Sequence, residues 1–175
     1  MYKEQDLEKV SEYLKAIEGV PADFIAYIDE TGIDSFVHRE FCRAKRGKKV
    51  ISKVSGKKYK RCGIVAAKMG KRIISPLQYD GTMDSQLFET WFAKMLLPAL
   101  PANTTIVMDN ASFHRKSRLT LLAEDAGHRI VFLPPYSPQL NPIENFWSWL
   151  KCRLRKVMPF FVSFDDALSD CFLVW

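Results

Sequence analysis

The chain has 175 residues, of which 47% are hydrophobic and 26% charged, a size and composition typical of one soluble globular domain. No apolar stretch approaches the roughly 20 residues that span a bilayer, and the acidic, amphipathic N-terminus is unlike a signal peptide. The cysteines (Cys42, Cys62, Cys152 and Cys171) are scattered without zinc-site spacing, which favours reduced thiols in a cytoplasmic protein.

The net charge of +6 is unevenly distributed. Residues 38–61 contain eleven Lys and Arg against one acid, Glu40, a local balance of +10, so the rest of the chain sums to −4. A concentrated basic segment on an acidic body indicates a polyanionic partner. The alternative is a lysine-rich, solvated hairpin with no partner.

The first half of the chain predicts one helix followed by a cluster of strands. Apolar residues recur at helical spacing over residues 3–18, and Gly19-Val20-Pro21 ends that helix. The first strand is expected to end at Asp29, before a turn around Thr31-Gly32. The predicted strands of this half are residues 24–28, a segment near 35–41, 62–68 and 72–79.

The second half alternates helices with β-branched strands. Helices are predicted at 84–97 and 116–126, and a third runs from Asn141 as N-cap, with Pro142 at its first position, to about Val157. Strands are predicted at 104–108 and 129–133. Because the late strands need crossover helices, they should be parallel, whereas the early strands can pair antiparallel. The prediction is an α/β fold, a mixed sheet with helices on both faces.

Three carboxylates stand at positions where chemistry is expected. Asp29 and Asp109 each follow an apolar run that reads as a buried strand, and Glu144 lies on the first turn of an amphipathic helix. Buried carboxylates are costly unless they are hydrogen-bonded, paired or bound to a cation. If the three carboxylates converge, they would form a site suited to Mg²⁺ or Mn²⁺. Two such ions about 3.5–4 Å apart could promote in-line displacement at a phosphodiester.

Each carboxylate also has a structural explanation. Asp29 and Asp109 could shape the turns that follow their strands. Glu144 fits a capping box with Asn141, in which the glutamate reaches back to the cap amide. A Ser112–His114–Asp109 triad is disfavoured because the chain has no GxSxG turn.

Three segments, IDETG, MDNASFHRK and LPPYSPQLNPIENFWSWLK, together resemble the catalytic domain of the DDE transposases, in the bacterial insertion-sequence branch of the mariner-like superfamily. The 34 residues between Asp109 and Glu144 match the spacing of that branch, as does a glutamate in the third position. The resemblance covers roughly residues 23–157.

This resemblance implies a ribonuclease-H-like fold with a mixed five-stranded sheet, and metal-dependent cleavage and strand transfer at insertion-sequence ends. Asp29, Asp109 and Glu144 would be the catalytic metal ligands for two Mg²⁺ or Mn²⁺ ions, supported by Asn110 and His114. For His114, a surface or DNA-phosphate contact is an equal alternative. The implied partner is double-stranded DNA, both transposon ends and target, bound by a homodimer in a synaptic complex. The implied location is the cytoplasm, at the nucleoid, and no membrane is expected.

The domain prediction is a connecting helix over residues 1–20 and a DDE catalytic domain over 21–175, without the N-terminal helix–turn–helix region of related full-length transposases. Two alternatives stay open: a related nuclease of the same fold, and a catalytically silent DNA-binding remnant. If the chain handles DNA, its basic residues would contact phosphates. The predicted DNA-binding residues are Arg43, Lys45, Arg46, Lys48, Lys49, Lys57, Lys58, Arg115, Lys116 and Lys151.

Overall fold

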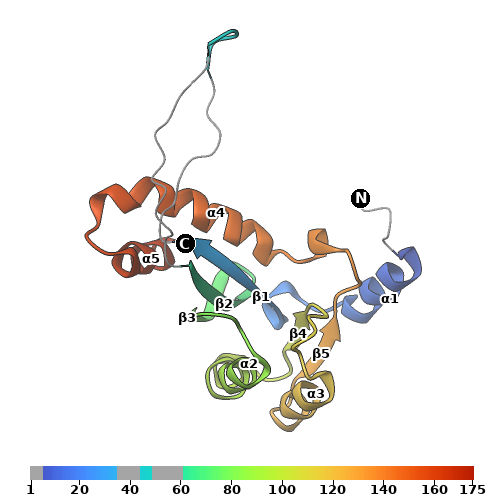
Figure 1. Ribbon diagram of the computed structural model, residues 1–175. Helices are drawn as coiled ribbons and strands as arrows, with labels where there is room; N and C mark the ends of the chain where they lie inside the picture. The colour runs from blue at the N-terminus through green and yellow to red at the C-terminus, as the bar shows by residue number, and fades with distance from the viewer. Residues whose placement is uncertain (1–5, 35–43, 49–60) are drawn as a thin grey trace.

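The computed structural model describes residues 6–34, 44–48 and 61–175. They form one five-stranded sheet in the order β3-β2-β1-β4-β5 (Figure 1). The strands are β1 (Ile25–Asp34), β2 (Arg61–Met69), β3 (Arg72–Asp80), β4 (Thr105–Met108) and β5 (Arg129–Phe132). The α-helices are α1 (Leu7–Ile17), α2 (Ser85–Trp91), α3 (Lys116–Asp125), α4 (Ile143–Val157) and α5 (Phe164–Leu173).

The sheet is mixed, as the order of strands and helices predicts. β1 pairs antiparallel with β2, and β2 with β3, whereas β4 lies parallel to both β1 and β5. Helices cover both faces: α2 and α3 lie on one side of the sheet and α4 and α5 on the other, with α1 beside β5 (Figure 1). No helix in the described part of the chain is long and apolar enough to cross a membrane.

Residues of β1 alternate between the two cores because successive side chains of a strand point to opposite faces. Ala26 and Ile28 pack in the cluster that contains α2 and α3 residues. Ile33 packs with the buried residues of α4 and α5, and Ile25 packs with Tyr13 of α1. The central strand is therefore covered on both faces, and any polar side chain in its middle enters a buried environment.

The predicted turn at Thr31-Gly32 is wrong, because β1 continues through these residues to Asp34. Gly32 lies opposite Gly63 in the antiparallel register. A Cβ at Gly32 would overlap the Arg61 guanidinium, and one at Gly63 would overlap the Tyr79 ring. The glycine thus marks close packing across a strand, not a turn. The strand predicted near 35–41 lies outside the described residues.

Strand β3 and the helix that follows it also differ from the regular elements predicted from the sequence. β3 contains an irregularity opposite the Val65–Ala67 step of β2, and Ser75 there has φ +50°. The Ser75 carbonyl accepts a hydrogen bond from Trp91 Nε1 at 2.8 Å. The helix predicted over 84–97 is α-helical only to Trp91 and continues as a π-helix (Phe92–Leu96) and a 3₁₀ turn (Leu97–Ala99).

The chain also contains a helix, α5, that the sequence patterns did not predict. Its N-cap is Ser163, whose Oγ accepts a hydrogen bond from the Asp166 amide at 3.1 Å. Ala167, Leu168 and Cys171 are buried in the same cluster as α4. This helix therefore completes the core on the α4 side of the sheet.

Candidate active site

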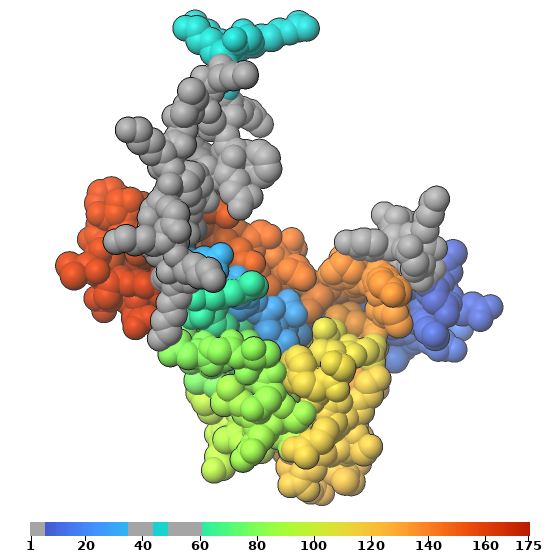
Figure 2. Space-filling model, viewed as in Figure 1, coloured from blue at the N-terminus to red at the C-terminus, as the bar shows by residue number. Residues whose placement is uncertain are grey.

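A notch forms where two neighbouring strands end at different points. β4 ends at Met108, and its last pairing with β1 joins Val107 to Tyr27, so beyond that level β1 is paired only with β2 among the described residues. Asp29 and Asp109 each follow that last pair by two residues. They line a hollow of about 320 Å³ together with Glu144. Figure 2 shows this face, where orange residues preceding α4 meet yellow residues following β4, with β1 in blue between them.

Asp29 lies in the middle of β1, not at its end, and points to the α4 face. Its Oδ2 accepts a hydrogen bond from Trp147 Nε1 at 3.0 Å. Burial raises the pKa of the Asp29 carboxyl to about 7, with a further contribution from the negative charge of Glu144. Trp147 is 2% exposed, and its indole also hydrogen-bonds a candidate ligand. The i, i+3 spacing of Glu144 and Trp147 on one helix face could have indicated this role.

Asp109 is held by the residues that follow it. His114 Nε2 donates to its Oδ1 over 3.2 Å, and the Ala111 amide donates to the same oxygen over 3.0 Å. The hydrogen bond from His114 lowers the pKa of the Asp109 carboxyl. The His114 side chain is 2% exposed and stacks near Phe88, with ring centroids 4.2 Å apart. His114 is thus buried against Asp109, and its supporting role stays a prediction.

The capping box predicted for Asn141 and Glu144 does not form. α4 begins at Ile143 after Pro142, and no side chain caps its N-terminus. The Asn141 Nδ2 instead donates to the Ile28 carbonyl of β1 over 3.4 Å, while its own carbonyl accepts from the Glu144 amide. Glu144 is exposed and lines the hollow. The capping box does not form because the Asn141 side chain packs against β1, where the residue is only 5% exposed.

Asn141 also has a side-chain hydrogen-bond acceptor that is not satisfied within the described residues. Its Oδ1 is buried and has no hydrogen-bond partner within the described residues, although the residue lines the carboxylate hollow. Buried polar atoms normally have a partner, from protein or water. The arrangement ties the start of α4 to the strand that carries Asp29.

Glu30, the neighbour of Asp29, points to the opposite face. It lines a separate hollow with Tyr79, Met83 and Phe113. Burial raises the pKa of the Glu30 carboxyl to about 8, and the charge of Asp29 adds to the shift. Glu30 therefore lies outside the hollow that holds the three candidate ligands.

Tyr136 lies at the rim of the carboxylate hollow. Its φ is +55°, a left-handed conformation that is unfavourable for a tyrosine, and its side chain is 61% exposed. Strained backbone of this kind concentrates at functional sites. After Tyr136 and Ser137, Pro138–Leu140 forms a short 3₁₀ helix.

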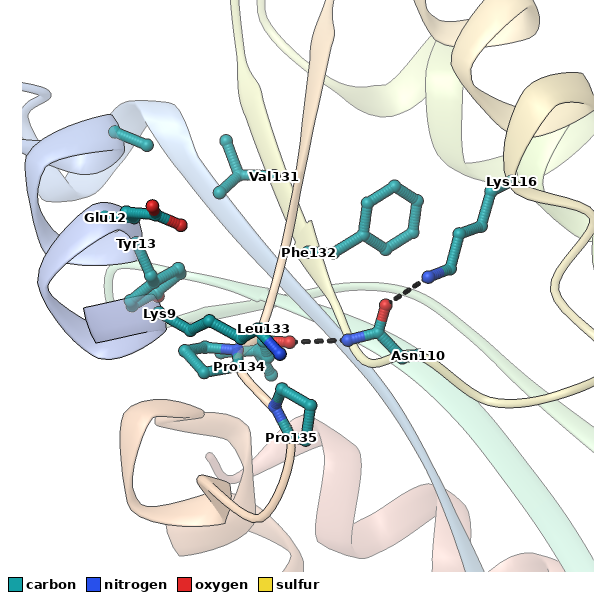
Figure 3. Close-up of a pocket in the computed structure, with 11 residues that line it drawn as sticks. Lys9, Glu12, Tyr13, Asn110, Lys116, Val131, Phe132, Leu133, Pro134 and Pro135 are labelled. Atoms are coloured by element: carbon teal, nitrogen blue, oxygen red, sulfur yellow. Dashed lines mark hydrogen bonds between the residues drawn. The ribbon is translucent and has the colours of Figure 1, made fainter. Parts of the chain in front are cut away.

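A second hollow of about 580 Å³ lies beside the first, between α1 and β5 (Figure 3). Asn110 belongs to both hollows: its Nδ2 donates to the Leu133 carbonyl over 2.6 Å, and its Oδ1 accepts from Lys116 Nζ. Leu133, Pro134 and Pro135 also line both. Asn110, which was predicted to support the site, therefore lies between the two hollows and lines both of them.

The predicted DNA-binding residues have different surroundings. Arg115 pairs with Glu89 through two contacts of 2.6 and 2.7 Å, and Lys116 contacts Asn110. Lys151 lies two turns beyond Glu144 on α4 and has no ion pair among the described residues. Lys45, Arg46 and Lys48 are exposed around a turn. Arg43, Lys49, Lys57 and Lys58 lie outside the described residues.

The carboxylate hollow suits a divalent cation in its chemistry. Its charged ligands are carboxylate oxygens, which Mg²⁺ and Mn²⁺ prefer, and the charge of Glu144 already disfavours ionisation of Asp29. Among the described residues, however, no three His, Cys, Asp or Glu side chains are arranged to hold a metal ion. Metal binding therefore requires these side chains to turn toward a common point.

Comparisons with known proteins identify a family and a fold. A family model described as DDE superfamily endonuclease matches residues 25–166. The uncharacterized protein y4pE/y4sA of Sinorhizobium fredii (strain NBRC 101917 / NGR234) is 32% identical over 79 residues, which cover 42% of this chain and 52% of that protein. This chain thus spans about half the length of its curated relative.

Solved structures show the same fold at low identity. The Mos1 transposase paired-end complex with left transposon end aligns with a TM-score of 0.64 and 14% identity, over 84% of this chain and 47% of that one. The catalytic core domain of BIV integrase aligns with a TM-score of 0.53 and 15% identity, over 86% and 82%. The mixed sheet is the ribonuclease-H-like sheet of these catalytic domains. The Mos1 paired-end complex has also been solved with Mn and with Mg.

Proposed function

The chain belongs to the DDE superfamily of endonucleases, and from this premise we propose that it is the catalytic domain of an insertion-sequence transposase. It would cleave DNA at the ends of the element and transfer the cut strands to target DNA. The observation that carries this proposal is the meeting of Asp29, Asp109 and Glu144 on one hollow, beside the middle of β1 and the end of β4. These residues lie on three different elements, separated by up to 115 positions.

Asp29, Asp109 and Glu144 would hold two Mg²⁺ or Mn²⁺ ions, consistent with the Mos1 complexes solved with Mn and Mg. Bound ions would make a water or 3′-hydroxyl a stronger nucleophile and stabilise the leaving oxygen. The protein's own contribution is to fix the ligands. Trp147 holds one oxygen of Asp29, and His114 holds one oxygen of Asp109. Such supporting contacts orient ligands and tune their affinity for metal.

The proposed partner is double-stranded DNA, both the transposon ends and the target. Support comes from the Mos1 structures, which include a paired-end complex and a strand transfer complex. We further propose that the protein acts as a homodimer that holds two ends in a synaptic complex at the bacterial nucleoid. Because this chain spans about half of its relatives, the end-recognition function of the whole protein is part of the proposal.

The test uses Asp109→Asn in a strand-transfer assay with a pre-cut oligonucleotide and Mn²⁺. An amide is a poorer metal ligand than a carboxylate, so joined products should fall by more than about a hundredfold. Asp125→Asn, an exposed substitution at the end of α3, is the matched control and should retain activity. DNA binding, measured by fluorescence anisotropy, should be nearly unchanged in both variants.

If the Asp109→Asn variant joins strands as well as the parent protein, the assignment of Asp109 to the active site is wrong. Cleavage without joining in the parent protein would favour the related nuclease. DNA binding without cleavage in Mg²⁺ or Mn²⁺ would favour a silent DNA-binding remnant.

A further inference from the structure

The second hollow, which we call the β5 groove, opens directly from the carboxylate hollow. The groove is lined by residues of α1, β5, the start of α3 and the prolines after β5, namely Lys9, Glu12, Tyr13, Ala16, Asn110, Lys116, Val131, Phe132, Leu133, Pro134 and Pro135. Four of these residues also line the carboxylate hollow. A chain that passes through the carboxylate hollow can therefore continue into the β5 groove without leaving the surface.

The charges in the β5 groove favour an anionic occupant. Lys9 and Lys116 extend into it from opposite sides, one from α1 and the other from the start of α3 (Figure 3). Both side chains are exposed, and Glu12 is the one carboxylate on the groove wall. Lys9 also lies 3.4 Å from Asp6, an exposed pair that contributes little and can open. The wall keeps a net positive charge beside the acidic site.

The remaining lining is apolar and includes flat side chains. Phe132 and the exposed Pro135 line the wall, and Lys116 Nζ lies 4.8 Å from the centre of the Phe132 ring. Tyr13 and Pro134 also belong to the lining, but both residues are buried. Sites for single-stranded nucleic acid combine these features: cations along the backbone path and flat apolar surfaces against the bases. A volume of about 580 Å³ suits a short single strand, not a duplex.

We propose that the β5 groove binds a single DNA strand that leaves the carboxylate hollow, so that α1 is part of the DNA-binding surface and not only a connecting helix. This inference rests on the proposed DNA-processing function and adds a binding site for unpaired nucleotides next to the scissile phosphate. Lys9 and Lys116 contact the phosphates of this strand. Phe132 and Pro135 contact its sugars and bases.

The test compares two probes by fluorescence anisotropy in Ca²⁺: a blunt duplex, and the same duplex with a short single-stranded tail. The full chain should bind the tailed duplex more tightly. Lys9→Ala/Lys116→Ala should lose about tenfold in affinity for the tailed duplex and much less for the blunt one. For the tailed probe, the slope of log affinity against log salt should decrease by about 0.7 for each lysine removed. Lys15→Ala, also exposed on α1 but outside the groove, is the matched control.

A photoreactive thymidine in the tail gives a readout that does not depend on variant stability. It should crosslink to peptides of α1 or of residues 131–135 in the unmodified chain. Crosslinks elsewhere, or equal reductions in affinity for both probes, would overturn the inference. An extended peptide that pairs with the edge of β5 is the competing occupant. If a peptide is the occupant, replacing the two lysines should leave the difference in affinity between the tailed and the blunt duplex unchanged. Joining activity with no tail effect would leave the proposed function intact and reject the groove alone.

Discussion

The Asp29 carboxyl is mostly buried, and it shares its hollow with two other carboxylates. Both conditions disfavour its negative charge. Among the described residues, the side chain that hydrogen-bonds it is the Trp147 indole, which is neutral. Without a cation, the protein disfavours the charged form of this side chain. A proton or a metal ion can relieve the same unfavourable charge, so the two should compete for Asp29.

The raised pKa of Asp29 predicts a pH dependence for the metal-free protein. Between pH 4 and pH 7 the folded chain keeps a proton on Asp29 that the unfolded chain has released. The stabilisation is present at low pH and is lost as the pH rises to about 7. Relative to Asp29→Asn, the parent protein should therefore lose stability by up to about 1.4 kcal/mol per pH unit in this window.

Urea denaturation of both proteins in EDTA, at several pH values, measures this difference. The difference should level off above pH 7, and Asp109→Asn should not reproduce it because the pKa of Asp109 is lowered. Parallel stability curves for Asp29→Asn and the parent protein would contradict the assigned environment.

At this scale, sequence reasoning identified the carboxylates but not all of their contacts. Asp29, Asp109 and Glu144 line one hollow, although Asp29 lies in the middle of its strand and not at its end, and their role as metal ligands stays a prediction. The contact between Trp147 and Asp29 spans 118 positions and depends on how α4 crosses the sheet. Asn141 resembles a helix cap in its local sequence, but a tertiary contact to β1 takes its side chain instead.

Among the elements, α5 determines how firmly α4 is held. Arg153 of α4 lies 3.3 Å from Asp170 of α5, and both are partly exposed, so apolar packing is the main connection. Leu168 is 3% exposed within this packing, whereas Leu173 at the end of α5 is 86% exposed. The two leucines differ in burial but not in chemistry.

Leu168→Ala should lower the free energy of unfolding by about 2–5 kcal/mol, because a buried leucine loses both its transfer energy and its packing. Leu173→Ala, the matched control, should change it by less than about 0.5 kcal/mol. Guanidinium denaturation followed by tryptophan fluorescence measures both. Equal effects would mean that α5 does not pack on α4.

The elements that sequence reasoning missed lack a long periodic pattern. α5 has ten residues, and only its Ser163 cap and the acids of its first turn mark its start. The extension of β1 depends on Gly32 meeting Gly63 in the next strand, which no local pattern reveals. By contrast, β2, β4 and α3 were predicted nearly to the residue, because each has an apolar run or a helical repeat with clear ends.

For the whole molecule, the central question is how an acidic site approaches DNA. The chain has a net charge of +6, and its basic residues concentrate between positions 38 and 61. Within the described part of that segment, Lys45, Arg46 and Lys48 are exposed. Their charge would attract DNA while divalent ions neutralise the three carboxylates.

Binding to random-sequence duplex DNA should therefore weaken steeply with salt. Replacing Lys45, Arg46 and Lys48 by alanine should reduce the slope of log affinity against log salt by about 2–3, roughly 0.9 for each phosphate that the protein no longer neutralises. A matched triple variant, Lys71→Ala, Arg72→Ala and Lys94→Ala, removes exposed charges elsewhere and should keep the slope. Anisotropy titrations between low and physiological salt make the comparison. Equal slopes would indicate that the basic segment is only a solvated loop.

The mixed parallel and antiparallel topology was predictable from the sequence because connection length constrains strand direction. Strand pairing across β1 was not, since it depends on contacts such as those at Gly32 and Gly63.

That glycine pair also determines which acid faces the carboxylate hollow. Asp29 and Glu30 are adjacent and point to opposite faces of the sheet, so a slip of one residue between β1 and β2 would exchange them. The Arg61 and Tyr79 side chains fill the space above the two glycines, and a slip would force them against a side chain. Alanine at Gly32 or Gly63 should thus act on the fidelity of folding, trapping molecules that are folded but carry the wrong acid in the active site.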